Sequence, residues 1–179
     1  LHPMYRRQRN MCIRDRCNAI VDSKLIEKLY EASNAGVKIN LFVRGICCLK
    51  PNVKGLSENI IVKSIIGRFL EHGRIYVFAN GGEFQSIKND VYISSADMMP
   101  RNLYTRVEAY VPLKNETVRS QILTQVIPAL INDTKNSWLL EQTGEYVKLE
   151  DKLNFCSHSY FMENPSLSGQ GTLSKFKTA

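Results

Sequence analysis

The sequence predicts an α/β domain of the layered type, with a mixed β-sheet flanked by helices. Two observations lead to this fold class. Segments in which apolar residues recur at helical spacing alternate with short apolar segments of strand period, and Gly, Pro and Asn separate the two kinds. The chain has 179 residues, of which 44% are hydrophobic, and this is enough for one ordinary domain with a buried core.

A helix is the first regular element that the pattern indicates. Apolar side chains recur on one helical face between Val21 and Tyr30, with Asp22 or Ser23 as the N-cap and Gly36 as the end. The next segment, VKINLFV at 37–43, alternates apolar and polar residues as a strand does. Arg44 follows at its carboxyl end, and IIVKSII at 60–66 fits either a buried strand or a short helix.

A β-hairpin is predicted for the middle of the chain. RIYVF at 74–78 and VYISS at 91–95 are its strands, and the connection between them is longer than a tight turn. A further strand is expected over RVEAYVPL at 106–113. The helix that follows is capped by Asn115, and Pro128 should end or kink it.

The chain is divided into a leader, one domain and a tail. Residues 1–16, LHPMYRRQRNMCIRDR, show neither the helical nor the strand period of apolar residues. Within them, MCIRD resembles the translated end of a sequencing-library adapter. We interpret 1–16 as an artefactual or disordered leader, with a native basic arm as the alternative. Residues 17–163 form the domain, in which 144–149 adds at most an edge strand. Residues 164–179 are rich in Ser, Gly and Lys and form a flexible tail.

Net charge, apolar runs and cysteine spacing limit the class of protein to which the chain can belong. The net charge is +7, but residues 1–16 hold five arginines against one aspartate, a net +4, which leaves +3 for the rest. Bulk charge therefore does not argue for nucleic acid. The sequence has no apolar run of about 18 residues and no export signal, and its five cysteines lack metal spacing. We expect a cytoplasmic protein with reduced thiols, with membrane association left open.

The segment RFLEHGRIYVF carries the candidate chemistry. If residues 72–78 are extended, His72, Arg74, Tyr76 and Phe78 share one face. An imidazole can exchange a proton or a phosphoryl group near neutral pH, and a guanidinium binds phosphate oxygens with two bonds. Other polar residues are placed to join them near the strand ends: Arg44, Ser95, Asp97, Arg101, Asn102, Arg106 and Glu108. Such a set suits phosphoryl transfer.

Purely structural roles remain as alternatives for the same residues. A single histidine beside an apolar strand is commonly a packed residue. Arg74 and Arg106 could pair with Glu71 and Glu108 at the surface. The adjacent thiols of the CC pair are expected to serve packing rather than nucleophilic attack.

Several motifs together resemble the C-terminal catalytic domain of bacterial polyphosphate kinase. They are NAIVDSKLIEKLYEASNAGVKINLFVRGICCLKP, GLSENI, SIIGRFLEHGRIYVFANGG and YISSADMMPRN, and FMENPSLSGQG is similar to the tail of some members. The resemblance covers about 18–113 and implies the second of two phospholipase-D-like domains. Met98, Tyr104, Thr105 and the longer hairpin connection depart from the family pattern.

The resemblance also implies an activity and roles for residues. The family transfers the terminal phosphate of ATP reversibly to polyphosphate through a phosphohistidine of the preceding domain, so this chain is expected to be a fragment that is inactive alone. Arg44 and Arg74 would bind phosphate, His72 would bind it and assist transfer, and Arg106 with Glu108 would organise the phosphate channel. Arg68, Ser95, Asp97, Arg101 and Asn102 are supporting candidates.

The implied partners are ATP, ADP, polyphosphate, the upstream domains and further copies in a homo-oligomer, with no specific nucleic acid. Mg²⁺ would be bound by upstream residues, and no metal ligand is assigned here. Two alternatives remain: a phospholipase-D-type phosphodiesterase formed by pairing of two copies, and a non-catalytic module that binds polyanions.

Overall fold

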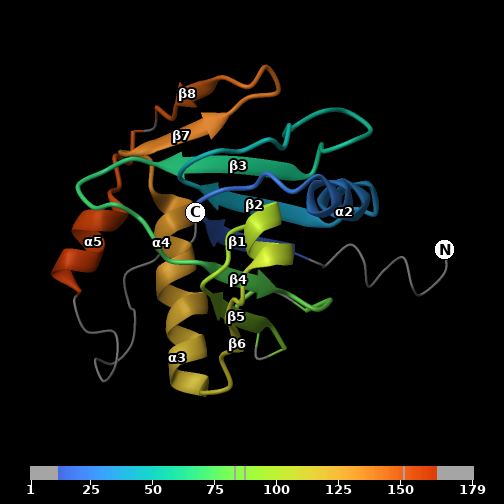
Figure 1. The fold of residues 1–179 in the computed structure, drawn as a ribbon. Helices are drawn as coiled ribbons and strands as arrows, with labels where there is room; N and C mark the ends of the chain where they lie inside the picture. The colour runs from blue at the N-terminus through green and yellow to red at the C-terminus, as the bar shows by residue number, and fades with distance from the viewer. Residues whose placement is uncertain (1–11, 83, 87, 151, 165–179) are drawn as a thin grey trace.

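The computed structural model describes residues 12–82, 84–86, 88–150 and 152–164. Its centre is an eight-stranded sheet in the order β6-β5-β4-β1-β2-β3-β7-β8 (Figure 1). Neighbours β1, β2 and β3 are parallel, whereas the other pairs are antiparallel, so the sheet is mixed as predicted. The strands are β1 Cys12–Cys17, β2 Lys38–Val43, β3 Ile60–Ile65, β4 Ile75–Phe78, β5 Asp90–Ser94, β6 Tyr110–Pro112, β7 Ser137–Leu140 and β8 Tyr146–Lys148.

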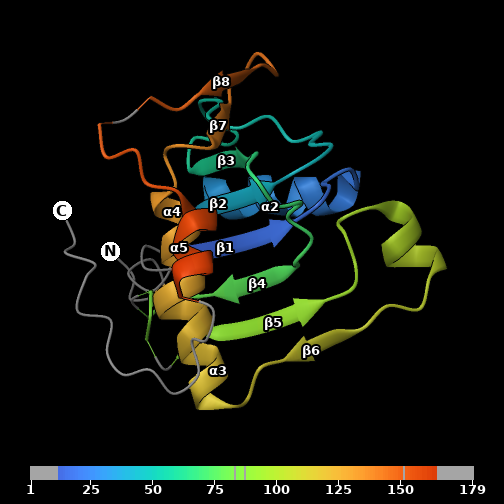
Figure 2. The same cartoon turned by 90° about the vertical axis from the view of Figure 1, so that its left-hand side faces the viewer.

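Helices cover both faces of the sheet (Figures 1 and 2). Helix α2, Ser23–Asn34, lies on one face. The opposite face carries α3 Glu116–Gln121, the π-helical η2 Ile122–Val126 and α4 Ile127–Asn132 in succession, with α5 Ser157–Glu163 against α4. The π-helical turn η1, Arg101–Thr105, connects β5 to β6.

The alternation of side chains along β4 divides the core. Tyr76 and Phe78 pack in the cluster under α2, whereas Ile75 and Val77 pack under η2 and α4. This confirms the predicted faces of the hairpin strand, and the pairing of β4 with β5 confirms the hairpin. The predicted first helix is also confirmed, with Asp22 as its N-cap accepting from the Leu25 amide at 2.9 Å.

The apolar run at 60–66, which fitted a strand or a helix, forms β3. It is paired on both sides, with β2 in parallel and with β7 in antiparallel orientation. Burial of most of its side chains explains its apolar residues, and Lys63 and Ser64 are buried along with them.

The prediction of disorder for residues 1–16 is wrong for residues 12–16. They belong to β1, which lies between β2 and β4 and is hydrogen-bonded to both. Charged Arg14, Asp15 and Arg16 hid the strand period, because pairing of the backbone on both edges does not depend on side-chain polarity. Residues 1–11 lie outside the described residues, and the foreign origin of the segment stays a prediction. The predicted tail lies almost wholly outside them as well, since the described chain reaches Asn164.

Pro128 was expected to end or kink the helix. It lies in the first turn of α4, where its missing N–H is tolerated, and the widened turn η2 directly precedes it. The helical segment therefore continues past Pro128, but its regular α-helical bonding is interrupted there. One further expectation is corrected. The strand expected over 106–113 is only β6, Tyr110–Pro112. The edge strand β8 was predicted within 144–149, but β7 and α5 were not.

Candidate functional site

A polar cluster lies where β1 and β2 end. Asn18 follows β1 and Arg44 follows β2, and because these strands are parallel, their carboxyl ends meet at one edge of the sheet. Asn18 Oδ1 accepts from Arg44 Nε at 3.2 Å and from Nη2 at 3.0 Å. His72 Nδ1 lies 3.3 Å from Arg44 Nη2 and 3.3 Å from Asn18 Nδ2.

The His72 imidazole is exposed, and it belongs to the loop before β4 rather than to the strand itself. Both of its Nδ1 neighbours are donor groups, so Nδ1 is the acceptor and the proton is on Nε2. His72 therefore presents a donor N–H beside the Arg44 guanidinium. It is not a packed core residue, which was the structural alternative.

Arg74 points beneath this cluster rather than out of it. Its Nε and Nη2 donate to the two oxygens of Asp97 at 2.9 and 2.8 Å. Asp97 also accepts from Asn18 N at 2.8 Å and from Asn18 Nδ2 at 3.2 Å. Burial acts to raise the pKa of Asp97, but the bonds from Arg74 and Asn18 outweigh it and hold that pKa below its ordinary value.

Glu108 organises a separate group. It accepts hydrogen bonds from the Ser95 hydroxyl and the Asn102 amide, and these bonds lower the pKa of its carboxyl group. The Arg106 charge acts on Glu108 in the same direction. Ser95 therefore supports Glu108, whereas Asp97, two residues later, supports Asn18.

The remaining predicted arginines lie at the surface. Arg68, Arg101 and Arg106 are exposed, and no side-chain contact among the described residues joins them to His72. The structure thus brings together Arg44, His72, Arg74 and Asp97, and it leaves the other predicted arginines outside that cluster.

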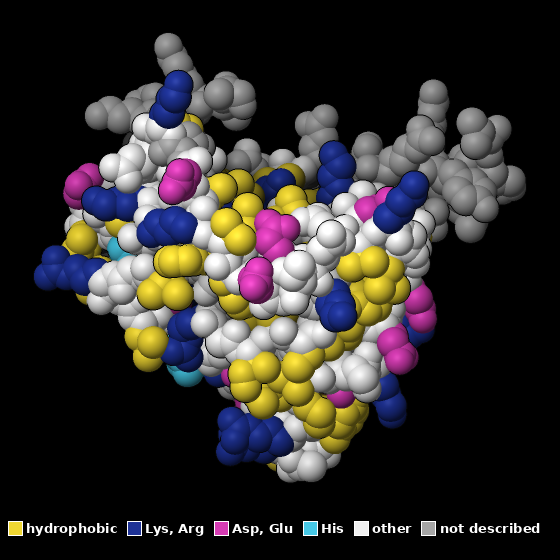
Figure 3. All heavy atoms as spheres, turned by 90° about the horizontal axis from the view of Figure 1, so that it is seen from above, with side chains coloured by type: hydrophobic (Ala, Val, Ile, Leu, Met, Phe, Trp, Pro, Cys, Tyr) yellow, Lys and Arg dark blue, Asp and Glu magenta, His cyan; other side chains and the backbone are white. Residues whose placement is uncertain are grey.

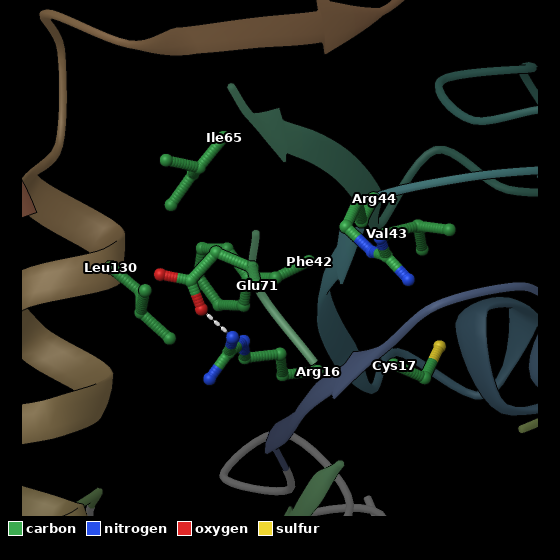
Figure 4. A pocket seen from close by; sticks show the side chains of 8 residues that line it. All are labelled: Arg16, Cys17, Phe42, Val43, Arg44, Ile65, Glu71 and Leu130. Atoms are coloured by element: carbon green, nitrogen blue, oxygen red, sulfur yellow. Dashed lines mark ion pairs between the residues drawn. The ribbon is translucent and has the colours of Figure 1, made fainter. Parts of the chain in front are cut away.

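The glutamate before His72 points the other way, into the protein. Glu71 is paired with Arg16, and its carboxylate is turned toward Leu130 (Figure 4). His158 Nε2, from α5, lies 2.7 Å from Glu71 Oε1, a close contact that is not aligned as a hydrogen bond. The cavity that Arg16, Glu71 and Leu130 help to line measures about 10 Å³, scarcely the space for one water, so any larger ligand of Arg44 and His72 has to bind on their exposed side.

Sequence reasoning did not single out Asn18 or His158, which the structure places in contact with Arg44, His72 and Glu71. The position of Asn18 at the end of a strand was a usable signal, but the strand β1 was not recognised. His158 gave no local signal, because α5 was not predicted and it meets the loop before β4 only in the folded chain.

Charge is dispersed on the face shown in Figure 3. Lys and Arg side chains alternate there with hydrophobic, Asp and Glu side chains rather than forming one basic stripe. Within the described part of the chain, no three His, Cys, Asp or Glu residues form a group that could hold a metal ion. Nor does any helix described here combine the length and apolar character that crossing a membrane requires.

Comparison with known proteins agrees with the motifs. A family model described as polyphosphate kinase C-terminal domain 2 matches residues 3–157, including most of the segment predicted to be a leader. The polyphosphate kinase of Erythrobacter litoralis is 56% identical over 155 residues, which are 86% of this chain and 22% of that protein. The polyphosphate kinase of Helicobacter pylori is 48% identical over 149 residues, which are 82% of this chain and 20% of that protein.

The fold is similar to that of a solved relative. The crystal structure of polyphosphate kinase from Porphyromonas gingivalis matches with a TM-score of 0.81 and 31% identity, over 90% of this chain and 25% of that one. The predicted phospholipase-D-like α/β fold is thereby confirmed. The chain spans about a fifth of the length of the curated relatives named here. With the family model matched over most of its length, the chain belongs to the polyphosphate kinase family, within the part described as C-terminal domain 2.

Proposed function

We propose that this chain is the C-terminal catalytic domain of a polyphosphate kinase, which transfers the terminal phosphate of ATP reversibly to polyphosphate. The phosphohistidine of that reaction would come from an upstream domain. One observation carries the proposal: Arg44 Nη2 and His72 Nδ1 converge to 3.3 Å at an open edge of the sheet. A permanent cation and a proton donor side by side are what a transferring phosphoryl group requires.

The two residues have different roles in this proposal. Arg44 binds phosphate oxygens and neutralises their charge, and Asn18 orients its guanidinium through two hydrogen bonds. His72 directs Nε2–H toward the phosphate, where it stabilises charge on oxygen or delivers a proton. Its orientation is set at Nδ1 by Asn18 and Arg44.

Arg74 supports the site from below. Its paired bonds to Asp97 occupy the fork that would otherwise bind phosphate, and its Nη1 also lies 3.4 Å from the His72 carbonyl oxygen. We therefore assign Arg74 and Asp97 to positioning. Arg106 and Glu108 are retained as proposed parts of the phosphate channel, with Ser95 and Asn102 fixing the Glu108 carboxylate.

Several partners belong to the proposal as a whole: ATP and ADP, polyphosphate, the upstream domains and further copies in a homo-oligomer, in the cytoplasm. Mg²⁺ is part of the proposed reaction, but the carboxylates in and beside the candidate site do not fit a Mg²⁺ site. Asp97 and Glu71 are each held by cationic side chains, and Glu108 is held by Ser95 and Asn102. No step of the role given to this chain depends on the ion.

Calorimetric titration with tripolyphosphate tests the binding half of this function. The wild-type chain should bind, and Arg44→Gln and His72→Ala should each weaken binding about tenfold or more, the loss of one charge-assisted contact. Lys54→Gln, which removes an exposed cation outside the cluster, should leave the affinity unchanged.

Polyphosphate synthesis by the full-length enzyme tests the catalytic half. With the same His72→Ala change it should no longer make polyphosphate from ATP. Undiminished synthesis by that variant, or hydrolysis of a model phosphodiester by this chain without ATP, would overturn the proposal.

A further inference from the structure

We propose that His158 is a positioning residue for the His72 site, acting through the loop of residues 66–73 that carries His72. The inference rests on the proposed function for the part that concerns phosphate. It assigns a role to a histidine that lies outside the shared motifs and 89 residues from Phe69, its partner in the loop.

Direct contacts join His158 to the loop at two points. Its Nδ1 accepts from the Phe69 amide at 3.3 Å, and its Nε2 lies 2.7 Å from Glu71 Oε1. Since Nδ1 is an acceptor, the proton of the neutral ring is on Nε2, which faces the carboxylate. Burial lowers the pKa of His158, against an opposing effect of Asp133, so the neutral ring is the favoured form.

The close packing of the loop against the His158 ring is a second, independent argument for the positioning role. A Cβ atom placed on Gly67 would lie 2.5 Å from His158 Nδ1 and 2.8 Å from Cε1, so the loop backbone lies directly against the ring. At the other end of the loop, a Cβ atom on Gly73 would lie 2.8 Å from Arg16 Nη1. The loop is thus seated between the His158 ring and the Arg16 guanidinium, with Glu71 contacting both.

The loop depends on these contacts because its own structure is weak. Residues 66–73 form neither helix nor strand, and Leu70 is 77% exposed. Glu71 is the side chain that points inward, and the next residue, His72, points outward to Arg44. A shift of Glu71 therefore displaces the imidazole from its 3.3 Å contacts.

His158 is itself firmly held. It is 1% exposed, and the preceding residue, Ser157, donates from its amide and hydroxyl to Asp133 Oδ2 at 2.7 and 2.6 Å. Asp133 is fully buried in the turn after α4. A shift of the α4–α5 region would therefore move the His158 ring and, through its contacts, the loop that carries His72.

The test uses three substitutions in the 179-residue chain. His158→Leu removes both contacts. His158→Asn keeps an acceptor, Oδ1, near the position of Nδ1. Gly67→Ala leaves His158 and Glu71 intact but forces the loop away from the ring. Ile127→Val, a core change outside the loop and in the cluster of Val77 and Leu123, serves as a control for lowered stability.

The first readouts need no ligand. Hydrogen exchange at the Phe69 amide should become at least tenfold faster in His158→Leu and return close to the wild-type rate in His158→Asn. The ¹⁵N chemical shift of His72 Nδ1 should move in His158→Leu and in Gly67→Ala, but not in Ile127→Val. An unchanged Phe69 rate together with an unchanged Nδ1 shift in His158→Leu would overturn the inference, whatever the chain binds.

Tripolyphosphate affinity is the second readout. It should fall at least fivefold in His158→Leu and Gly67→Ala, stay unchanged in Ile127→Val, and recover in His158→Asn. Wild-type affinity in both of the first two variants would refute the positioning role while leaving the proposed function intact. If the wild-type chain binds no tripolyphosphate, the proposed function fails instead, and the exchange and chemical-shift measurements still decide the role of His158.

Discussion

Arg74 and Asp97 form a paired, two-bond contact, with Nε donating to Oδ1 at 2.9 Å and Nη2 to Oδ2 at 2.8 Å. The same carboxylate accepts two hydrogen bonds from Asn18, which in turn holds Arg44 and His72. The Arg74 guanidinium is therefore bound within the protein, by Asp97. It stabilises the base of the site, and in the proposed function Arg44 is the guanidinium that binds phosphate.

This pair should behave as one unit in a double-mutant cycle. Arg74→Ala and Asp97→Ala should each lower the free energy of unfolding by about 2 kcal/mol, because each leaves a largely buried charge without its partner. The double variant should lose about 1–3 kcal/mol less than the sum of the two. Urea unfolding at pH 7, well above the ordinary Asp97 pKa of 3.8, measures all three values. Strict additivity would mean that the two side chains do not interact.

Asn18 should matter to ligand binding more than to stability. Asn18→Ala removes both bonds to the Arg44 guanidinium and one neighbour of His72 Nδ1. We expect tripolyphosphate affinity to fall about tenfold, or about 1.4 kcal/mol, because Arg44 is no longer oriented. Gln142→Ala, at an exposed turn position, is the control. Equal affinities for wild type and Asn18→Ala would remove Asn18 from the site.

Part of the site followed from general rules of α/β sheets. Arg44 was located by the rule that ligands gather beyond the carboxyl ends of parallel strands, and it does lie beside His72. Pairing of Arg74 with a carboxylate was one of the alternatives, but the expected partner, Glu71, is bound by Arg16, and Arg74 is paired with Asp97. Sequence spacing alone did not identify that partner. His158 could not be found at all, because its contact with Glu71 exists only after α5 packs against the rest of the fold.

In the fold, too, the elements encoded by neighbouring residues were predicted, whereas those that depend on distant residues were missed. Helix α2 was predicted because its cap at Asp22 and its apolar face are encoded locally. Strand β1 was missed, because Arg14, Asp15 and Arg16 interrupt the apolar pattern while the neighbouring strands supply the hydrogen bonds. Pro128 does lie next to an irregular turn, but the sequence did not tell that the helix continues beyond it.

Asp133 should be critical for the C-terminal part of the domain. Its carboxylate accepts from the amides of Asn136 and Ser157 at 2.9 and 2.7 Å, and from the hydroxyls of Ser137 and Ser157 at 3.1 and 2.6 Å. Asp133→Ala leaves the Asn136 and Ser157 amides and the Ser157 hydroxyl without this acceptor, whereas the Ser137 hydroxyl keeps its bond to the Asp133 carbonyl oxygen at 2.6 Å, so we expect a loss of about 3 kcal/mol or more. Thermal unfolding measures the effect, with the exposed Glu150→Ala as control. A melting temperature equal to that of the control would show that Asp133 does not anchor α5.

Asp15 gives the chain an unusual dependence of stability on pH. It lies in the centre of the sheet, 3% exposed, and burial raises the pKa of its carboxyl group from 3.8 to about 8, although the Val77 amide donates to it at 3.3 Å. Between these two pH values the folded chain binds a proton that the unfolded chain has lost. Stability should therefore fall as the pH rises from about 4 to 8, by an amount on the order of several kcal/mol.

Asp15→Val should remove this dependence, because valine suits a buried strand and has no charge to desolvate. At pH 7 the variant should have a free energy of unfolding higher by about 2 kcal/mol or more, and the gain should shrink toward pH 4, where the native carboxyl is neutral in both states. Urea unfolding of both chains at several pH values isolates Asp15, since other titrating groups, Lys63 and His158 among them, contribute equally to each curve. Glu58→Gln, at an exposed carboxylate, should leave the curve unchanged. A gain that is constant from pH 4 to pH 8 would show that the Asp15 carboxyl group is not titrating with a raised pKa.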